Sequence, residues 1–313
     1  GKPYQLRDLT HTSTPSIGIV MFRGGHIALN ELLKRADVAM YQAKAAGRNN
    51  ARFYDPTMQA AATVRTQLLT EMRNGLEHGE FLLHYQPQVD RHGQVTGAEA
   101  LVRWNHPDNG LMTPGQFIAL AEETGMILPL GQWVLEAACT QLVEWSHAPA
   151  TVAWTVAVNV SALQFAQADF VASVDRALQS TGANPSLLKL ELTESMLAVN
   201  MDDIIFKMKE IQSRGVAFSL DDFGTGYSSL SYLKLLPLTQ LKIDQSFVRD
   251  LLTDASDAVI ARSVVALGHS LGLSVIAEGV ETWAQRNFLA ELGCDAFQGY
   301  YFGRPGPASL LHS

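Results

Sequence analysis

The feature that most constrains the fold is a repeat that begins at Phe81, in which apolar runs of strand length alternate with helical segments. This alternation is typical of a parallel sheet with crossover helices. The predicted strands are 81–85, 97–98, 152–158, 187–190, 216–220, a short one at Leu241, 273–277 and 295–297. Eight strands in about 230 residues predict an α/β fold, a TIM-like (β/α)₈ barrel, whose site lies at the carboxyl ends of the strands.

A polar side chain follows each predicted strand. In chain order these are Gln86, Glu99, Asn159, Glu191, the pair Asp221 and Asp222, Lys242, Glu278 and Gln298. One of them alone could be a helix cap or a solvated strand end, but the whole series is hard to explain in that way. Adjacent strand residues point to opposite faces, so Asp221 and Asp222 can share an ion only where their strand ends. Gly224 and Gly226 indicate such an end.

These acidic and amide groups predict a divalent metal site. Their oxygens are hard ligands, and no HExxH motif, histidine pair or cysteine cluster accompanies them, so Mg²⁺ or Mn²⁺ is favoured over zinc. Carboxylates that converge in one pocket repel one another unless cations lie between them. Two divalent ions bridged by a carboxylate are a common arrangement for phosphodiester hydrolysis.

Composition narrows the classes of protein and partner. The chain has 313 residues, of which 47% are hydrophobic and 17% charged, as in ordinary globular proteins. Its formal net charge of −8 argues against DNA or RNA as a partner, although bound metal would still allow a small anionic ligand. No apolar segment approaches the length of a bilayer span, and the two cysteines fit a reducing compartment. We expect a cytoplasmic location, free or as part of a larger membrane-anchored sensor, with no membrane contact by this segment.

Residues 1–56 predict a small separate unit. Extended runs at 4–9 and 15–22 precede a helix predicted at 31–46, with Asn30 as its N-cap and Gly47 at its C-terminal end. Two strands and a helix are too few to bury a core, so we expect missing partners upstream. Residues 57–80 predict an amphipathic connecting helix.

This first unit resembles the C-terminal part of a GGDEF, or diguanylate cyclase, domain. The matching segments are Ser16-Ile17-Gly18-Ile19, residues 36–44, Gly47-Arg48-Asn49 and Phe53-Tyr54-Asp55. The GG(D/E)EF signature that carries cyclase chemistry in that family is absent from this sequence. The resemblance therefore implies no cyclase activity for this chain.

Residues 81–307 resemble an EAL-type cyclic di-GMP phosphodiesterase, and we place that domain at 81–313. The matches are Tyr85-Gln86-Pro87, Glu99-Ala100-Leu101-Val102-Arg103-Trp104, Asn159-Val160-Ser161, Glu191-Leu192-Thr193-Glu194, residues 221–230, Lys242-Ile243-Asp244, residues 278–282, Gln298-Gly299-Tyr300 and Phe302-Gly303-Arg304-Pro305. The resemblance implies metal-dependent hydrolysis of one phosphodiester bond of cyclic di-GMP to linear pGpG.

The resemblance also implies a role for each matching residue. The ligands of two ions, Mg²⁺ or Mn²⁺, would be Glu99, Asn159, Glu191, Asp221, Asp222 and Glu278, with Asp221 as the bridge. The catalytic residues would be Lys242, which holds the attacking water, with Glu278 and Asp222. The substrate-binding residues would be Gln86, Arg103, Asp244, Glu281, Gln298 and Pro305. Glu194 would anchor the loop at 221–230, and Ca²⁺ is expected to inhibit because it tolerates looser geometry.

Other interpretations stay open or are rejected on the motifs themselves. The resemblance implies a homodimer through the barrel and cyclic di-GMP as substrate. The rivals are a non-catalytic cyclic di-GMP receptor and a purely structural interaction module. A GxSxG-like run at 268–272 is predicted to close a helix, which does not suit a hydrolase nucleophile. Taken alone, Arg103 would be a surface ion pair and Lys242 a solvated strand end.

Overall fold

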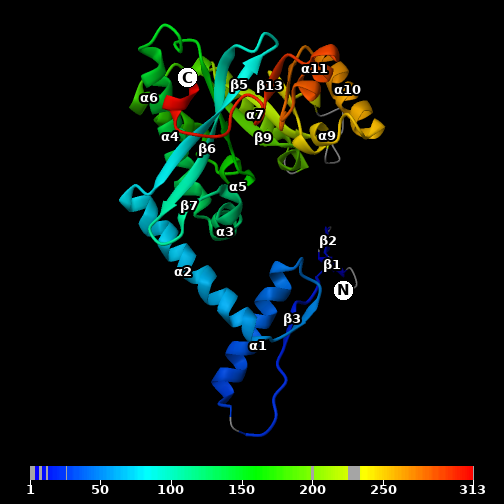
Figure 1. Cartoon of the computed structure of the whole chain (residues 1–313). Helices are drawn as coiled ribbons and strands as arrows, with labels where there is room; N and C mark the ends of the chain where they lie inside the picture. The colour runs from blue at the N-terminus through cyan, green and yellow to red at the C-terminus, as the bar shows by residue number, and fades with distance from the viewer. Residues whose placement is uncertain are drawn as a thin grey trace. The chain divides into compact units, whose positions relative to one another are not determined.

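The computed structural model describes residues 4–6, 9–11, 13–25, 27–198, 201–224 and 233–312. They belong to two compact units, Gly1–Asn74 and Gly75–Ser313, and Figure 1 labels their elements. Within these described ranges, no helix is both long and apolar enough to cross a membrane.

The first unit is a small α+β arrangement around one helix. β1 (Tyr4–Leu6) pairs with β2 (Leu9–His11) antiparallel, whereas β3 (Ile17–Ile19) pairs with β4 (Ala51–Phe53) in parallel. α1 (Leu29–Ala45) packs against β3, and a Cβ at Gly18 would lie 2.0 Å from the carbonyl oxygen of Ala36. This close approach explains why a glycine suits the middle of β3. α2 (Pro56–His78) follows.

The predicted N-cap of α1 at Asn30 is wrong. The helix begins two residues earlier than predicted, at Leu29, with Ala28 as its N-cap and no capping side-chain hydrogen bond. A capping preference is worth only about 1 kcal/mol, so packing of the helix can decide where it starts. At the other end, Gly47 follows the helix with φ 94°, a conformation that favours glycine.

The second unit is built on a closed barrel of eight strands, as predicted. The strands are β5 (Phe81–Asp90), β6 (Val95–His106), β8 (Thr155–Asn159), β9 (Leu188–Thr193), β10 (Ala217–Phe223), β11 (Gln240–Ile243), β12 (Ser274–Ala277) and β13 (Ala296–Gln298). Their order is β5-β13-β12-β11-β10-β9-β8-β6, and pairing between β5 and β6 closes the circle. β7 (Gly110–Met112) extends the sheet beyond β6.

The expectation of an all-parallel sheet is wrong for the first strand. β5 runs antiparallel to both of its neighbours, β6 and β13. A tight turn joins β5 to β6, because Asp90 Oδ1 accepts hydrogen bonds from the backbone N–H groups of His92 (2.8 Å) and Gln94 (2.9 Å). Gln86 and Glu99 therefore lie opposite each other in mid-strand rather than at strand ends.

Helices separate most of the remaining strands. They are α3 (Ile118–Thr124), α4 (Ile127–Ser146), α5 (Ala162–Phe165), α6 (Phe170–Thr181), α7 (Met201–Gln212), α9 (Gln245–Arg249), α10 (Ala255–Ser270) and α11 (Trp283–Glu291). Short 3₁₀ helices include η3 (Glu194–Ala198) and η4 (Ala308–His312). The GxSxG-like run closes α10, since Ser270 is its last residue and β12 starts only at Ser274. A nucleophile elbow has the reverse order, strand before helix. Ser270 is therefore not the nucleophile of an α/β-hydrolase.

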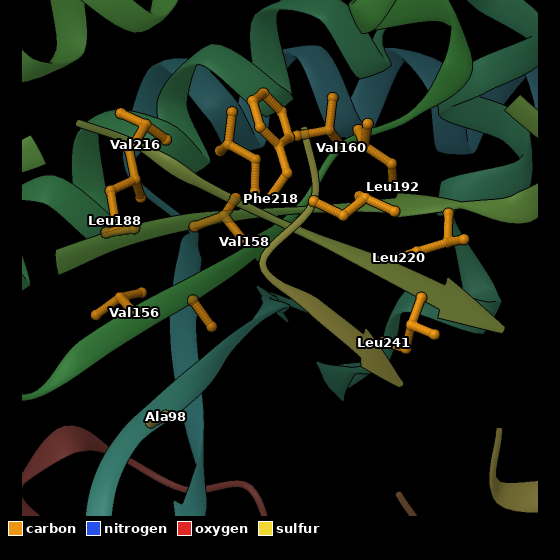
Figure 2. Close-up of a cluster of buried hydrophobic side chains, with 14 of the residues drawn as sticks. Ala98, Val156, Val158, Val160, Leu188, Leu192, Val216, Phe218, Leu220 and Leu241 are labelled. Carbon is orange, nitrogen blue, oxygen red and sulfur yellow. The ribbon is translucent and has the colours of Figure 1, made fainter. Parts of the chain in front are cut away.

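On β9, β10 and β11, apolar side chains on one face alternate with largely polar side chains on the other. Figure 2 shows apolar side chains of neighbouring strands, among them Val158, Leu188, Phe218 and Leu241. They belong to one buried cluster with residues of α4, α6 and α7. Because strand side chains alternate, the residues between them point the other way, into the barrel. The interior-facing set thus includes the polar residues Lys189, Glu191, Ser219, Asp221, Gln240 and Lys242.

Candidate active site

Lys242 on β11 lies at the centre of a carboxylate cluster. Its side chain has no exposed surface, and its Nζ lies 2.6 Å from Glu191 Oε2, 3.3 Å from Asp221 Oδ2 and 3.8 Å from Glu99 Oε2. Nζ also forms an ion pair with Glu278 Oε1. In strand order β6, which carries Glu99, lies directly across the circle from β11. The cluster therefore spans the interior of the barrel, and Lys242 is not the solvated strand end that its sequence position alone would suggest.

The charges of this cluster are strongly coupled. Burial alone would lower the pKa of Lys242, but the carboxylates around it, led by Glu191 and Glu278, raise that pKa well above its usual value. Burial raises the pKa of Glu191 to about 8 and that of Glu278 well above its usual range, with Lys242 opposing both shifts. One ammonium thus only partly offsets the cost of burying several carboxylates.

Glu99 is held on both of its oxygens by amide groups. Asn159 Nδ2, at the end of β8, donates to Glu99 Oε1 at 2.5 Å. Gln298 Nε2, at the end of β13, donates to Glu99 Oε2 at 2.5 Å and to Gln86 Oε1 at 3.1 Å. The structure thus brings together four residues that the sequence placed in the site, from four different strands.

The Asp221–Asp222 pair sits at an irregularity and not at the end of its strand, which continues to Phe223. The register between β10 and β11 shifts between Leu220 and Phe223, and Asp222 has φ 54°. Its backbone N–H donates to Asp221 Oδ1 at 2.9 Å. Burial, then the nearby Asp221 and Asp244 carboxyls, raise the pKa of Asp222 to about 6. The register shift between β10 and β11 lets the side chains of two adjacent aspartates reach one region, which a regular strand would not allow.

The loop that follows this pair is tied to η3. Glu194 Oε2 accepts a hydrogen bond from the backbone N–H of Gly224 at 3.1 Å, which is the contact expected of a loop anchor. The rest of the predicted loop, residues 225–230, lies outside the described residues.

Two of the predicted substrate-binding positions lie beside a turn near the C-terminus. Gln86 Nε2 donates to the carbonyl oxygen of Gly303 at 3.3 Å, and Tyr85 exchanges two backbone hydrogen bonds with Gly306. These contacts place Pro305, which is half-buried, next to β5.

Arg103 is not a surface ion pair. Its side chain is 9% exposed and donates to the carbonyl oxygen of Val102 at 2.9 Å. Burial lowers the pKa of Arg103, while Tyr300 and Glu99 oppose that shift. Arg103 is therefore a buried cation that faces the same interior as Glu99.

The remaining two predicted substrate contacts have other environments. Asp244 caps α9, since its Oδ1 accepts from the N–H of Ser246 at 2.9 Å, and it also neighbours Asp222. Glu281 has an exposed side chain, and its backbone N–H donates to Gln285 Oε1 at 2.9 Å. In the part of the chain that the structure describes, no ion pair joins the Glu281 side chain to Lys242.

The cluster fits a hard divalent cation in its donor chemistry. Its ligating atoms are oxygens, and Glu191 Oε1 is buried without a hydrogen-bond partner among the described residues. In those same residues, no three acidic, histidine or cysteine side chains are already spaced around one ion position. Here the carboxylates are gathered around the Lys242 ammonium instead.

An apolar cavity of about 450 Å³ opens next to Asn159. It lies among β6, β8, α3 and α4, and Leu101, Ile118 and Val160 contribute to its apolar lining. Thr193 adds a polar group at its edge. A cavity of this volume, with mostly apolar walls and a few polar groups, is typical of small-molecule binding sites.

A barrel with this site defines a known class. Residues 69–305 match the EAL domain, so the chain belongs to the EAL domain family, as the sequence motifs predicted. Residues 1–50 match the family described as "Diguanylate cyclase, GGDEF domain".

Two curated relatives come from Pseudomonas aeruginosa. The chain is 47% identical to the bifunctional diguanylate cyclase/cyclic di-GMP phosphodiesterase MucR over 99% of its own length and 45% of MucR. It is 42% identical to the cyclic di-GMP phosphodiesterase NbdA over 99% of its own length and 40% of NbdA. The chain thus spans less than half the length of these relatives.

Solved structures match the barrel. The PaMucR phosphodiesterase in complex with c-di-GMP has 50% sequence identity and a TM-score of 0.76, with 78% of this chain and 99% of that chain covered. The cAMP- and cyclic-di-GMP-bound form of the EAL enzyme Bd1971 has 31% identity and a TM-score of 0.76, with 91% and 75% covered.

The sequence analysis missed several polar residues that face the interior, for example Gln88 and Lys189. Gln88 on β5 donates from Nε2 to Gln298 Oε1 at 2.9 Å, and Lys189 on β9 donates to Gln240 Oε1 at 2.8 Å. Both lie two residues from a residue that the analysis did select, Gln86 and Glu191 respectively. The period of two along a strand would have placed them on the same interior face.

Proposed function

We propose that this chain hydrolyses one phosphodiester bond of cyclic di-GMP and releases linear pGpG. The observation that carries the proposal is the oxygen-rich cluster around Lys242, to which residues from opposite sides of the barrel contribute. Relatives named as cyclic di-GMP phosphodiesterases and a 50% identical domain solved with c-di-GMP support the choice of substrate.

The residues that would hold two Mg²⁺ or Mn²⁺ ions are Glu99, Asn159, Glu191, Asp221, Asp222 and Glu278. Their oxygen donors and the partnerless Glu191 Oε1 support this assignment. When bound, two such ions neutralise a phosphate and make a water available as hydroxide near neutral pH. Ca²⁺ would inhibit, since it accepts looser coordination.

Lys242 would hold and orient the attacking water, because its buried ammonium is a donor in the middle of the cluster. The water oxygen forms a new bond to phosphorus, the bond from phosphorus to the 3′ oxygen breaks, and that oxygen leaves with a proton. Arg103, a buried cation, would face the substrate phosphates, and Gln86 with the turn at Pro305 would line the nucleotide site. The apolar cavity beside Asn159 offers space for a base.

A non-catalytic cyclic di-GMP receptor is the rival function. A receptor has no need to retain the lysine at the centre of the carboxylates, and here that lysine makes four ionic contacts. Incubating the purified chain with cyclic di-GMP and Mg²⁺, and separating the nucleotides, tests the proposal. We expect pGpG with Mg²⁺ or Mn²⁺ and none with excess chelator. Binding without any product would favour the receptor, and full activity in chelator would refute the metal assignment.

We further propose a homodimer formed through the barrel near the loop at 221–230. The start of this loop lies against two helices, since a Cβ at Gly224 would be 3.1 Å from Phe247 of α9 and 3.8 Å from Ile260 of α10. Val259 on α10 and Leu252 in the turn between α9 and α10 are exposed apolar residues (62% and 50%). A partner on this face could influence the aspartate pair through the loop. A fully active monomer in sedimentation at assay concentration would contradict the dimer.

A further inference from the structure

Gln88 lies inside the barrel among residues of the proposed site. It follows Gln86 by two positions on β5, so both side chains point to the same face. Its partner position on β6 is Gly97, which has no side chain, and its partner on β13 is Gln298. Gln88 and Gln298 are each 3% exposed. On its other side Gly97 packs closely on β8, since a Cβ there would lie 2.4 Å from the carbonyl oxygen of Thr155.

The two glutamines form a directed chain of hydrogen bonds that ends at Glu99. Gln88 Nε2 donates to Gln298 Oε1 at 2.9 Å. Gln298 Nε2 then donates to Glu99 Oε2 at 2.5 Å and to Gln86 Oε1 at 3.1 Å. If the Gln298 amide turned over, its oxygen would face the Glu99 carboxylate and its NH₂ would face the NH₂ of Gln88. The donor on Gln88 therefore acts together with the acceptors Glu99 and Gln86 to fix which end of Gln298 meets Glu99.

We propose that Gln88 is a positioning residue that acts through Gln298 to orient the Glu99 carboxylate for metal binding. The inference rests on the proposed function in one respect, the assignment of Glu99 as a metal ligand. Without the donor on Gln88, the buried Oε1 of Gln298 loses its partner, and the cost of an unsatisfied buried carbonyl favours displacement of the Gln298 side chain from the position in which it holds Glu99. Groups that orient metal ligands typically change metal affinity or activity by ten- to a hundredfold.

The test replaces Gln88 by methionine, which has a similar length and volume but no donor. Mn²⁺ binding to the full chain is measured without substrate, from the electron paramagnetic resonance signal of free Mn²⁺. We expect Gln88→Met to weaken Mn²⁺ binding roughly tenfold or more. The matched control is Gln240→Met, because Gln240 is also a buried interior glutamine (7% exposed) and its 2.8 Å bond goes to Lys189. The control should bind Mn²⁺ within about twofold of the parent. Loss of the hydrogen bond at Gln240 should lower stability without changing the orientation of Glu99.

A double-mutant cycle separates positioning from general packing. If Gln88 acts through Gln298, then Gln88→Met should weaken Mn²⁺ binding no further in a Gln298→Met background. Additive losses, or unchanged Mn²⁺ affinity in Gln88→Met, would overturn the inference. Should Gln88→Met not fold, as judged by its urea unfolding curve, Gln88→Leu takes its place in the same cycle.

The outcome also separates this inference from the proposed function. A parent chain that binds Mn²⁺ but releases no pGpG would refute the proposed hydrolysis and leave the Gln88 effect on binding to be read directly. A parent that hydrolyses cyclic di-GMP while Gln88→Met binds Mn²⁺ normally would refute the inference alone. A parent that binds no Mn²⁺ would refute both.

Discussion

Two lysines point into the same barrel, and their environments shift their pKa values in opposite directions. Lys242 on β11 is surrounded by carboxylates, which outweigh its burial and raise its pKa well above the usual value. Lys189 on β9 donates to the neutral amide of Gln240, and burial lowers its pKa, with Glu191 opposing and Lys242 reinforcing the shift. Each lysine lies on the face that carries the other polar interior residues.

The opposite directions of the two pKa shifts come from the neighbouring groups, since both lysines are buried and lose contact with water. A carboxylate favours the charged form of a lysine, whereas an amide supplies a hydrogen bond but no opposite charge. The layer formed by Lys242 and its carboxylates, here called the upper layer, thus stabilises a lysine in its charged form. The lower layer, formed by Lys189 and Gln240, accommodates a buried lysine without stabilising its charge. We expect chemistry to depend on the first layer and only stability on the second.

The largest effect should come from Lys242→Ala. Loss of the group that orients the attacking water should lower the hydrolysis rate by roughly two orders of magnitude or more. Affinity for cyclic di-GMP should stay within a few-fold, because other groups bind the nucleotide. The measurements are affinity in Ca²⁺ and single-turnover rate in Mg²⁺. A variant that loses binding but keeps its bound-state rate would make Lys242 a substrate clamp.

Glu99→Gln should lower kcat/KM by a factor on the order of a hundred or more, about 3 kcal/mol of transition-state stabilisation. The substitution replaces one oxygen by an NH₂ group, which would face the amide NH₂ of Asn159 or of Gln298. Rates are measured with Mg²⁺, and a urea unfolding curve serves as the control for folding. Turnover equal to that of the parent would show that Glu99 is not a metal ligand.

Lys189→Met should leave hydrolysis within about threefold and lower the free energy of unfolding at pH 7 by roughly 1–3 kcal/mol, because the buried Oε1 of Gln240 loses its lysine donor. The pH dependence of the free energy of unfolding should distinguish the parent from Lys189→Met more clearly. The folded pKa of Lys189 lies below its unfolded value of about 10.4, so between these two values the unfolded chain binds more protons and stability rises with pH. The methionine variant lacks this contribution.

The free energy of unfolding, measured in urea at pH 7 and pH 10, checks the sign. The parent should gain stability relative to Lys189→Met on going to pH 10. Equal differences at both pH values would show that Lys189 is not shifted by the fold, and the contrast with Lys242 would fail.

The smallest effect should come from the double variant Lys189→Met with Gln240→Met. Replacing both partners of a buried hydrogen bond by apolar groups of similar shape is often close to neutral, so we expect the second substitution to cost less than about 0.5 kcal/mol in the background of the first. Unfolding free energies of the four combinations give this number. A large loss of hydrolysis in the double variant would instead place the lower layer in the active site.

Much of the architecture follows from the sequence alone. Apolar runs such as 216–220 and 273–277, each followed by acidic residues and separated by helical segments, are local patterns, and they predicted the barrel and a set of carboxylates at the ends of its strands. Strand residues with a period of two report which side chains share a face, so the grouping of Glu191 with Asp221 needed only the strand assignments. The motifs also predicted the EAL domain family, which the match over residues 69–305 shows.

Only the tertiary structure decided how these groups meet. Closure of the barrel brings β6 opposite β11, so that Glu99 reaches Lys242 across 143 positions of sequence, and no local pattern encodes that distance. The turn at Asp90 reverses β5, which sets Gln86 against Glu99 and Gln88 against Gln298. Side-chain type and strand period are properties of short segments, whereas register and the direction of an amide depend on which strands become neighbours when the sheet closes.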